Sequence, residues 1–535
     1  MCYLPLHLAI ILYINQFKGS NPLPETETEI YIQFIAHSII RYIRREKAVD
    51  YINIRNFKDV ERELKEEGQD ELDLFHAICM IAFETKLVSH LIFGDSYLID
   101  HFPDHFSSRS YRNKLSKNGL GILSNYTKKI QTNFEEPQYS FQHLTVQEFL
   151  GAYYLSRVSS ENCLEYIELH GRSNDLRQLW RFFFGLTKHS PSSPVYFDKI
   201  LAANSSQGSE TLFLAHCLFE AQKSEYSTQN CRAFLASRNG KVDVSNIILN
   251  SSDCAAIGYS VSQCPLDLRE LVMNYCQVGS GGIRAMNYQM DEVKAIFTNA
   301  IDMQVRSQFN PIGNEGGSPL TDVLEKMPHL TELRLYGNEL GNQKLLELQP
   351  VISSMTNLRI LVLTKNNLDP KSGETMGKII CNLRSLIQFH ASYNPIGTEG
   401  LEHLLPGLLN CKQLQRLELC DCRLSSKSGQ LFSKIISQLS NLEQLELYRN
   451  QLGDDGIEDM IESLKVAPNL KQLNFTQNGI TDRGGCCLAE LAEVAPSLQE
   501  MRLFYNEVSD VTRKAFYEAA QRRTQQELHE IRYAI

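Results

Sequence analysis

The C-terminal half of the chain repeats one eleven-residue pattern, and this repeat constrains the fold more than any other feature. The pattern LxxLxLxxNxL, with conservative replacements, begins at residues 330, 358, 386, 414, 442, 470 and 498. Each start lies 28 residues after the previous one, from LTELRLYGNEL at 330 to LQEMRLFYNEV at 498. Regular spacing over seven units indicates a repeat architecture, in which one supersecondary unit is stacked many times.

Each unit predicts a strand, a turn and a helix. The leucines at its first, fourth and sixth places point into the core, and the asparagine bonds backbone groups that the turn after the strand leaves unpaired. These asparagines are Asn338, Asn366, Asn394, Asn450, Asn478 and Asn506, and Cys422 stands in the remaining unit. The rest of a unit, such as GIEDMIESLKVAPNL, has helical periodicity. We therefore expect a leucine-rich-repeat horseshoe with a parallel inner sheet and outer helices, capped by weaker units near 268 and 302.

The residues that point from the inner sheet are the candidate partner-binding residues. They are Glu332, Arg334, Tyr336, His390, Arg416, Glu418, Glu446, Tyr448, Lys471, Glu500, Arg502 and Phe504. Charges of both signs alternate there with aromatic rings, which favours a protein partner over a phosphate backbone. For any single one of these residues, an ordinary solvated position is the alternative.

The N-terminal half contains one well-marked helix start, in the stretch YSFQHLTVQEFL at residues 139–150. Thr145 and Glu148 have the spacing of a capping box with Thr145 as the N-cap, and Leu144 and Phe149 have the spacing of a hydrophobic staple. His143 then lies at the positive end of a buried helix. It either donates to a bound phosphate or is satisfied by a neighbouring carbonyl, and this stretch alone leaves both readings open.

Three segments followed by the repeat array resemble the NACHT and leucine-rich-repeat (NLR) family of innate immune sensors: CYLPL, LPETETEIYIQFI and YSFQHLTVQEFLGAYYL. The repeats themselves resemble those of ribonuclease inhibitor. The resemblance implies that His143, in a winged-helix domain, contacts the β-phosphate of ADP and that Pro5 packs against the adenine. For a chain that contains the rest of the nucleotide site, it therefore favours the phosphate reading of His143.

The chain departs from the family in one respect, because it contains no GxxxxGK[ST] motif. We therefore expect no enzyme activity and no cofactor in this chain, which resembles the C-terminal part of such a protein; ADP or ATP with magnesium is implied only for a longer parent. The expected domains are 1–45, the end of NACHT helical domain 1; 46–158, a winged-helix domain; 159–255, a second helical domain; 256–329, atypical capping repeats; and 330–535, leucine-rich repeats with a C-terminal helical cap.

The composition limits which classes of binding partner the chain can have. The net charge of -10 gives no general attraction to nucleic acid or to an anionic membrane. The 14 cysteines show no zinc-site spacing, so no metal site is expected, and their scatter favours a reduced, cytoplasmic setting. The apolar run near the N-terminus lacks a basic flank and is too short to span a bilayer.

Two functions follow as hypotheses. The first is the regulatory and ligand-sensing portion of an intracellular NLR-type receptor, which binds a protein or microbial ligand on the concave repeat face and restrains nucleotide-dependent oligomerisation. The alternative is a free-standing leucine-rich-repeat inhibitor of the ribonuclease-inhibitor type. An enzyme is the weakest reading, since no nucleophile elbow, HExxH or metal constellation occurs in the sequence.

Overall fold

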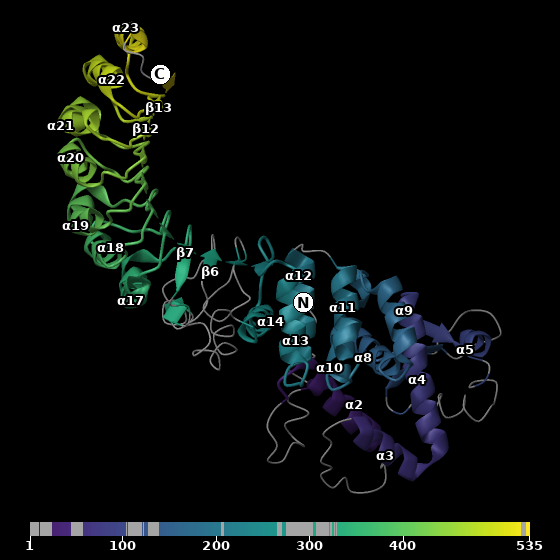
Figure 1. Ribbon diagram of the computed structural model, residues 1–535. Helices are drawn as coiled ribbons and strands as arrows, with labels where there is room; N and C mark the ends of the chain where they lie inside the picture. Colours follow the sequence, from purple (N-terminus) through teal and green to yellow (C-terminus); the bar gives the residue numbers. More distant parts are fainter. Residues whose placement is uncertain are drawn as a thin grey trace. The chain divides into compact units, whose positions relative to one another are not determined.

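The computed structural model of the chain is drawn in Figure 1. It describes residues 10, 24–43, 57–102, 104, 120, 122–126, 138–204, 208–264, 270–273, 276, 303–306, 320–321, 324–325, 327, 329–525 and 531–534. Pro5 lies outside these residues. The chain forms two compact units, one from residues 1–205 with 213–234 and one from residues 206–212 with 235–535.

The first unit is mainly helical and contains one small sheet. Its elements are α2 (Glu27–Ile43), α3 (Phe57–Glu67), α4 (Gln69–Leu87), β1 (Ile92–Gly94), α5 (Asp95–His101), β2 (Leu123–Tyr126), β3 (Gln138–Phe141), α8 (Leu144–Leu155), α9 (Ser160–His170), η2 (Asn174–Leu176), α10 (Arg177–Thr187) and α11 (Ser193–Ala203). Helices α12 (Gly208–Glu220) and α13 (Ser227–Ala236) follow. The three strands pair antiparallel in the order β1-β3-β2, and α8 begins just after the central strand.

Aromatic side chains hold α2, α8 and α10 together. Tyr31 stacks on Phe149 at 5.9 Å between ring centroids, and both rings contact Phe182, at 5.1 and 5.2 Å. All three side chains are fully buried. These rings pack α8 against α2 and α10, in agreement with the buried helix that the sequence predicts after His143.

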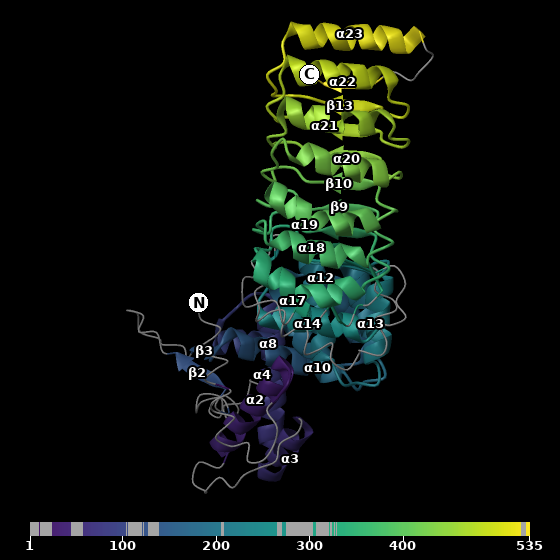
Figure 2. The same cartoon turned by 90° about the vertical axis from the view of Figure 1, so that its left-hand side faces the viewer.

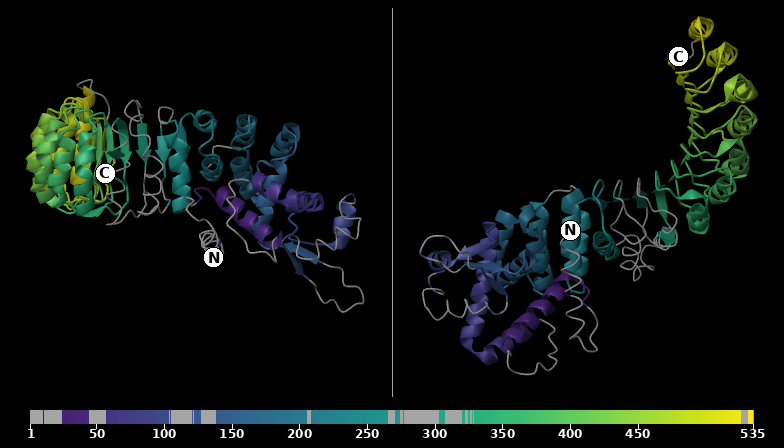
Figure 3. Two further views of the ribbon diagram at one scale, coloured as in Figure 1. Left: turned by 90° about the horizontal axis from the view of Figure 1, so that it is seen from below. Right: turned by 180° about the vertical axis from the view of Figure 1, so that it is seen from behind.

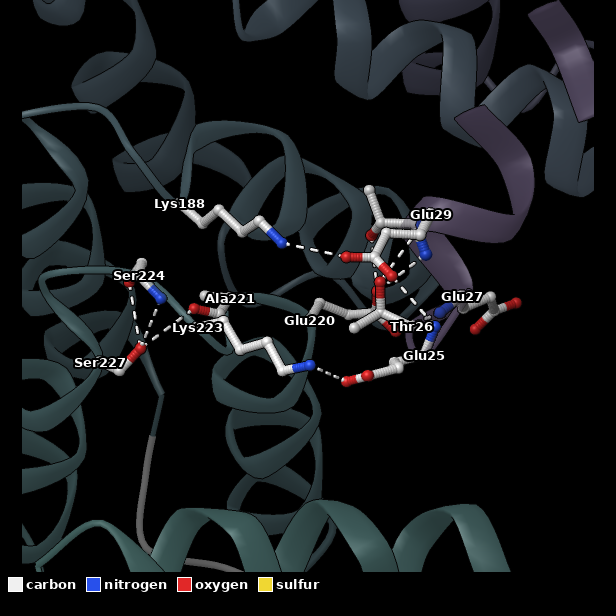
Figure 4. Close-up of polar contacts among 11 residues, drawn as sticks. Glu25, Thr26, Glu27, Glu29, Lys188, Glu220, Ala221, Lys223, Ser224 and Ser227 are labelled. Atoms are coloured by element: carbon white, nitrogen blue, oxygen red, sulfur yellow. Dashed lines mark hydrogen bonds and ion pairs between the residues drawn. The ribbon is translucent and has the colours of Figure 1, made fainter. Parts of the chain in front are cut away.

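The N-terminal end of α2 is anchored by a glutamate that is distant in the sequence (Figure 4). Glu220 accepts hydrogen bonds from the backbone N–H of Glu27 (3.2 Å) and Thr28 (2.8 Å) and from the Thr28 hydroxyl (2.6 Å). Arg181 in turn donates to Glu27 at 2.9 Å. The buried carboxylate therefore supplies the cap that the first turn of α2 would otherwise lack.

The second unit is built on one parallel sheet of 11 strands, from β4 to β14 in sequence order. The strands are β4 (Lys241–Asp243), β5 (Glu270–Val272), β6 (Met303–Arg306), β7 (Leu330–Arg334), β8 (Ile360–Val362), β9 (Gln388–His390), β10 (Arg416–Glu418), β11 (Gln444–Glu446), β12 (Gln472–Asn474), β13 (Glu500–Arg502) and β14 (Arg532–Ala534). Glu332 lies opposite Ile360, Ile360 opposite Gln388, and Gln388 opposite Arg416. The same place of each repeat thus forms one row across the sheet.

One helix follows nearly every strand and covers the other side of the repeats. After α14 (Ser251–Ser262) these helices are α17 (Gly341–Ser354), α18 (Ser372–Cys381), α19 (Gly397–Asn410), α20 (Ser428–Gln438), α21 (Gly453–Lys465), α22 (Asp482–Val494) and α23 (Asp510–Gln525). Figure 2 shows α17 to α23 stacked in sequence order, and both views of Figure 3 show the green and yellow helices on one side of the strands. A buried row that includes Leu361, Phe389 and Leu417 fills the space between strands and helices.

The predicted asparagine bonds are confirmed in the repeats. The amide of Asn366 donates to the carbonyls of Leu335 (2.7 Å) and Leu363 (2.9 Å), and its oxygen accepts from the backbone N–H of Asn338 (3.0 Å). Asn394, Asn450, Asn478 and Asn506 donate to carbonyls in the same way. At the exceptional unit, the thiol of Cys422 contacts the carbonyl of Ala391 at 3.5 Å. These asparagines, which we call the asparagine ladder, therefore satisfy backbone groups that the turns leave inside the core.

Two expectations about the ends of the repeat array differ from the structure. The sheet begins at β4, inside the range 159–255 that the sequence assigned to a second helical domain. At the other end α23 is followed by β14, which pairs with β13, so a strand rather than a helix is the outermost described element. Short strands without leucine spacing gave no sequence signal. Among the described helices, none is both long and apolar enough to cross a bilayer.

Candidate functional site

The inner face of the sheet is built from three rows of side chains. Because neighbours along a strand point to opposite faces, the residues on either side of the buried leucine of each strand point away from the helices. In β10 these residues are Arg416 and Glu418, which flank the buried Leu417. The next row begins with Tyr336 and includes Tyr448 and Phe504, at equivalent places just after their strands.

A hollow of about 410 Å³ lies in the middle of this face. Eight of the twelve predicted partner-binding residues line it: Arg334, Tyr336, His390, Arg416, Glu418, Glu446, Tyr448 and Arg502. Val362, Thr364, Ser392, Tyr393 and Cys420 complete the lining. The structure thus brings together predicted residues from five of the seven repeats.

Three arginines of the hollow are each held by a glutamate two residues away on the same strand. Nε of Arg416 donates to Glu418 at 2.6 Å, and Nε of Arg502 donates to Glu500 at 2.7 Å. Arg334 donates to Glu332 in the same way. Glu332 and Glu500, which the sequence placed among the partner-binding residues, therefore orient arginines of the hollow without lining it themselves.

His390 lies between two of these arginines and is neutral. Burial, aided by the charges of Arg416 and Arg334, lowers the pKa of His390 from 6.5 to about 3. Nδ1 of His390 lies 3.2 Å from Oε2 of Glu418, and because the ring is neutral this contact is not an ion pair. Burial also raises the pKa of Glu418, an effect that Arg416 opposes.

Tyrosines line one side of the hollow, and the sequence analysis missed one of them. The hydroxyls of Tyr393 and Tyr448 lie 2.9 Å apart, and their ring centroids are separated by 6.3 Å. Tyr393 has a left-handed backbone with φ of 58°, which turns its side chain toward the inner face from a place outside the predicted rows. The equivalent residues of the other repeats also have positive φ, but their residue types differ, so the sequence carried no signal for this position.

Two predicted partner-binding residues lie away from the hollow. Lys471 was expected on the inner face, but it lies one residue before β12 and its ammonium contacts Glu443 at 2.7 Å. The inner residues of that strand are Gln472 and Asn474 instead. Phe504 follows β13 and is 46% exposed outside the lining of the hollow.

The predicted helix start near residue 145 needs correction. The N-cap of α8 is His143 rather than Thr145, and Nδ1 of His143 accepts from the backbone N–H of Thr145 at 3.2 Å. Glu148 does not complete a capping box, because its carboxylate is paired with Lys86 at 2.8 Å in a buried contact. The local pattern was misread because Lys86 belongs to another helix, α4.

The part of the chain that the structure describes holds no group of three or more acidic, histidine or cysteine side chains placed to bind a metal ion. Its cysteines are free thiols, and most of them are buried. Pro5, the other candidate nucleotide contact, cannot be placed against His143 because it lies outside the described residues.

The parallel sheet, the asparagine ladder and the outer helices together define a leucine-rich-repeat protein. The family model "Leucine Rich repeat" matches residues 438–460 and 466–489. This agrees with the two units that contain β11 and β12.

The chain is related to NACHT, LRR and PYD domains-containing proteins and to ribonuclease inhibitors, which confirms the resemblance drawn from its motifs. It is 26% identical to NACHT, LRR and PYD domains-containing protein 12 of Mus musculus over 353 residues, which are 62% of this chain and 32% of that protein. It is 27% identical to the ribonuclease inhibitor of Sus scrofa over 226 residues, 42% of this chain and 48% of that protein. It is 34% identical to NACHT, LRR and PYD domains-containing protein 12 of Homo sapiens over 149 residues, which are 27% of this chain and 14% of that protein.

These alignments span between about a third and a half of the first two relatives. The relatives are proteins of the leucine-rich-repeat type, and both groups are compatible with the fold of the second unit.

Proposed function

We propose that this chain is the regulatory and ligand-sensing portion of an intracellular NLR-type receptor, and that its repeats bind a protein or microbial ligand on their inner face. The observation that carries the proposal is the hollow of the inner sheet, where arginine, glutamate and tyrosine side chains from several repeats converge. Arginine and tyrosine are the residues that protein interfaces favour. Relatedness to NACHT- and LRR-containing proteins supports the receptor context.

The helical unit would supply the restraint on oligomerisation. Its three-stranded sheet next to α8 is compatible with a winged-helix domain, in which the family places a histidine against ADP. His143 fits that role in its local chemistry. Since Nδ1 accepts from Thr145, the neutral ring carries its proton on Nε2, the tautomer that can donate to a phosphate. In a longer parent protein His143 would then hold a phosphate of ADP at the N-terminus of α8.

We propose no catalytic activity for the chain itself. The loop amides, lysine and hydroxyl that bind nucleotide phosphates and magnesium belong to the GxxxxGK[ST] motif, which the sequence lacks. ADP, ATP and magnesium are therefore proposed only for a longer parent, in which His143 and Pro5 would add two contacts to a site supplied mainly by other residues.

The alternative function is that of a free-standing inhibitor. The similarity to the ribonuclease inhibitor of Sus scrofa, 27% identity over 226 residues, supports it. The two readings share the inner face as the binding surface and differ in whether a nucleotide controls it.

One experiment separates the two. We expect the genomic sequence 5′ of Met1 to encode GxxxxGK[ST] in the same reading frame. The longer protein should be monomeric with ADP in size-exclusion chromatography with light scattering, and His143→Ala should form oligomers with ATP, while Gln142→Ala behaves as the wild type. If no such reading frame exists and the chain stoichiometrically inhibits a pancreatic-type ribonuclease, the sensor proposal is wrong and the alternative is right.

A further inference from the structure

The inner hollow has a feature that defines the chemistry of its ligand: the arginines lie outermost. The side chains of Arg334, Arg416 and Arg502 are 25%, 38% and 42% exposed, whereas their glutamate partners are 5%, 19% and 28% exposed. In each pair the carboxylate therefore lies deeper and the guanidinium faces the hollow.

The arginines also keep donors available. Arg334 donates to Glu332 through Nε. Arg502 is bound to Glu500 through Nε as well. Arg416 uses Nε and Nη2 on Glu418. A guanidinium fixed through Nε is pre-organised, and its outward N–H groups match the two oxygens of a carboxylate.

Two of the arginines lie near His390. Arg334 and Arg416 line the same hollow as His390, which is on β9 between their strands, and the positive charges of both act on its ring. The imidazole is neutral and hence adds no charge, and the carboxylates of Glu332 and Glu418 are paired with these two arginines and less exposed than they are. The solvent side of this spot therefore attracts one negative group.

The charge of the inner rows around the hollow limits how negative that ligand can be. On β7 to β13 these rows contain three arginines and four glutamates, Glu332, Glu418, Glu446 and Glu500. A polyanion gains nothing from a face without excess positive charge, because its binding depends on neutralising several phosphates at once. One carboxylate bound by a pair of arginines is compatible with this balance, and a nucleic acid is not.

Next to this spot the tyrosines offer an apolar wall. Tyr336, Tyr393 and Tyr448 line the same hollow, and Tyr393 is 40% exposed. Rings of this kind bury apolar side chains at little cost in conformational entropy. A volume of about 410 Å³ accommodates one or two side chains of a loop rather than a helix.

We propose that the hollow binds an exposed loop of a partner protein through one aspartate or glutamate side chain, which Arg334 and Arg416 receive, and a neighbouring apolar side chain, which packs against Tyr393 and Tyr448. This rests on the proposed function, since it specifies what the inner face recognises.

The test uses the full chain and a phage library of random peptides as the probe. Peptides selected on the wild type are synthesised with blocked ends, and their affinities are measured by calorimetry. We expect an acidic residue next to an aromatic or aliphatic one in the selected peptides. Replacing that residue by its amide should weaken binding about tenfold, since an uncharged acceptor forms weaker bonds with arginine.

Variants of the chain assign the contact. The double variant Arg334→Gln/Arg416→Gln should weaken binding by about 30-fold or more, as expected for loss of charged partners in an interface. Arg359→Gln/Arg384→Gln removes the same charge from exposed positions outside the hollow and should change binding less than about twofold. The double variant Arg334→Lys/Arg416→Lys retains the positive charges but lacks the paired N–H groups of the guanidinium. We therefore expect an intermediate loss of affinity. Circular dichroism verifies that each variant is folded.

Three results would overturn the proposal. If selected peptides need Tyr336 or Tyr393 but contain no acidic residue, the inner face still binds partners and only the carboxylate assignment fails. If no peptide depends on the hollow, both this proposal and the proposed function of the inner face fail. If single-stranded RNA binds the hollow in the micromolar range, the charge argument is wrong and the partner is a nucleic acid.

Discussion

The two units satisfy their buried polar groups in opposite ways. In the repeats an asparagine makes the same bonds again and again, each time to backbone groups of its own and the preceding turn, as Asn366 and Asn394 do. In the helical unit Glu220 and Thr28 are joined across 192 residues by bonds that occur once. The repeated asparagine bonds can be predicted from the sequence, and losing one of them affects its own repeat. The bonds of Glu220 cannot be predicted from the sequence, and losing them affects several helices.

The largest effect is expected at Glu220. Glu220→Ala leaves the amides of Glu27 and Thr28 and the Thr28 hydroxyl without their acceptor, while Arg181 keeps its ion pair with Glu27. Because each unpaired buried donor costs about 1–3 kcal/mol, we expect the helical unit to lose about 3–5 kcal/mol. Trp180 is the only tryptophan of the chain and lies buried in α10, so urea unfolding followed by its fluorescence reports this unit. The control is Glu225→Ala, at an exposed ion pair with His189. An unchanged midpoint for Glu220→Ala would remove the contrast between the two units.

A smaller and local effect is expected at Asn366. Asn366→Ala unpairs buried carbonyls and amides and should cost about 1–3 kcal/mol. Hydrogen exchange should accelerate in peptides that cover β7 to β9 while the Trp180 transition stays in place. Cys422→Asn is the matched control, because it places an asparagine in the one repeat that has a cysteine at this position. We expect this substitution not to destabilise the repeats. Equal destabilisation by both substitutions would contradict the ladder account.

The repeats could be predicted from the sequence because the residues that stabilise them recur every 28 residues. Leucines specify the buried row of the core, and asparagines specify the turns. The α8 start was misread for the opposite reason. Thr145 and Glu148 have capping-box spacing, but Lys86 of α4 captures Glu148 and His143 takes the cap. Local spacing carries no information about a partner in another helix.

The candidate site was predictable to a similar degree. Alternation along each strand gave the residues of the hollow, such as Arg334 and Arg416. It missed Tyr393, whose side chain depends on a left-handed backbone angle. It also included Lys471, which lies one place before its strand and so belongs to a different row. Errors of one residue matter in a strand because neighbours face opposite sides.

Acid should weaken the repeats through His390. In the unfolded chain this histidine titrates near its ordinary pKa of 6.5, whereas in the folded chain its pKa is about 3. Below pH 6.5 the unfolded state therefore binds a proton that the folded state does not, so stability falls from about pH 6.5 toward pH 3. His390→Gln should flatten this part of the curve in urea unfolding followed by circular dichroism. Identical pH slopes for the variant and the wild type would place His390 in a solvated, ordinary environment.

The smallest expected effect is the binding of nucleotide to the chain. His143 and Pro5 could contribute about 1 kcal/mol each, which does not offset the several kcal/mol lost on immobilising a ligand. The chain should therefore not hydrolyse ATP or bind ADP below the millimolar range. Calorimetric titration with ADP and with Mg-ATP checks this. Micromolar binding or turnover would mean that the helical unit holds a nucleotide site outside the predicted contacts.

The central claim is that recognition takes place at the inner hollow, and site-specific photo-crosslinking measures this most directly. A benzophenone side chain at Tyr336 in the hollow is compared with the same group at Gln349, which lines a separate hollow on the outer helices. With a library-selected peptide we expect crosslinks from position 336 and none from position 349. Crosslinks from position 349 alone, or equal yields from both positions, would contradict the account.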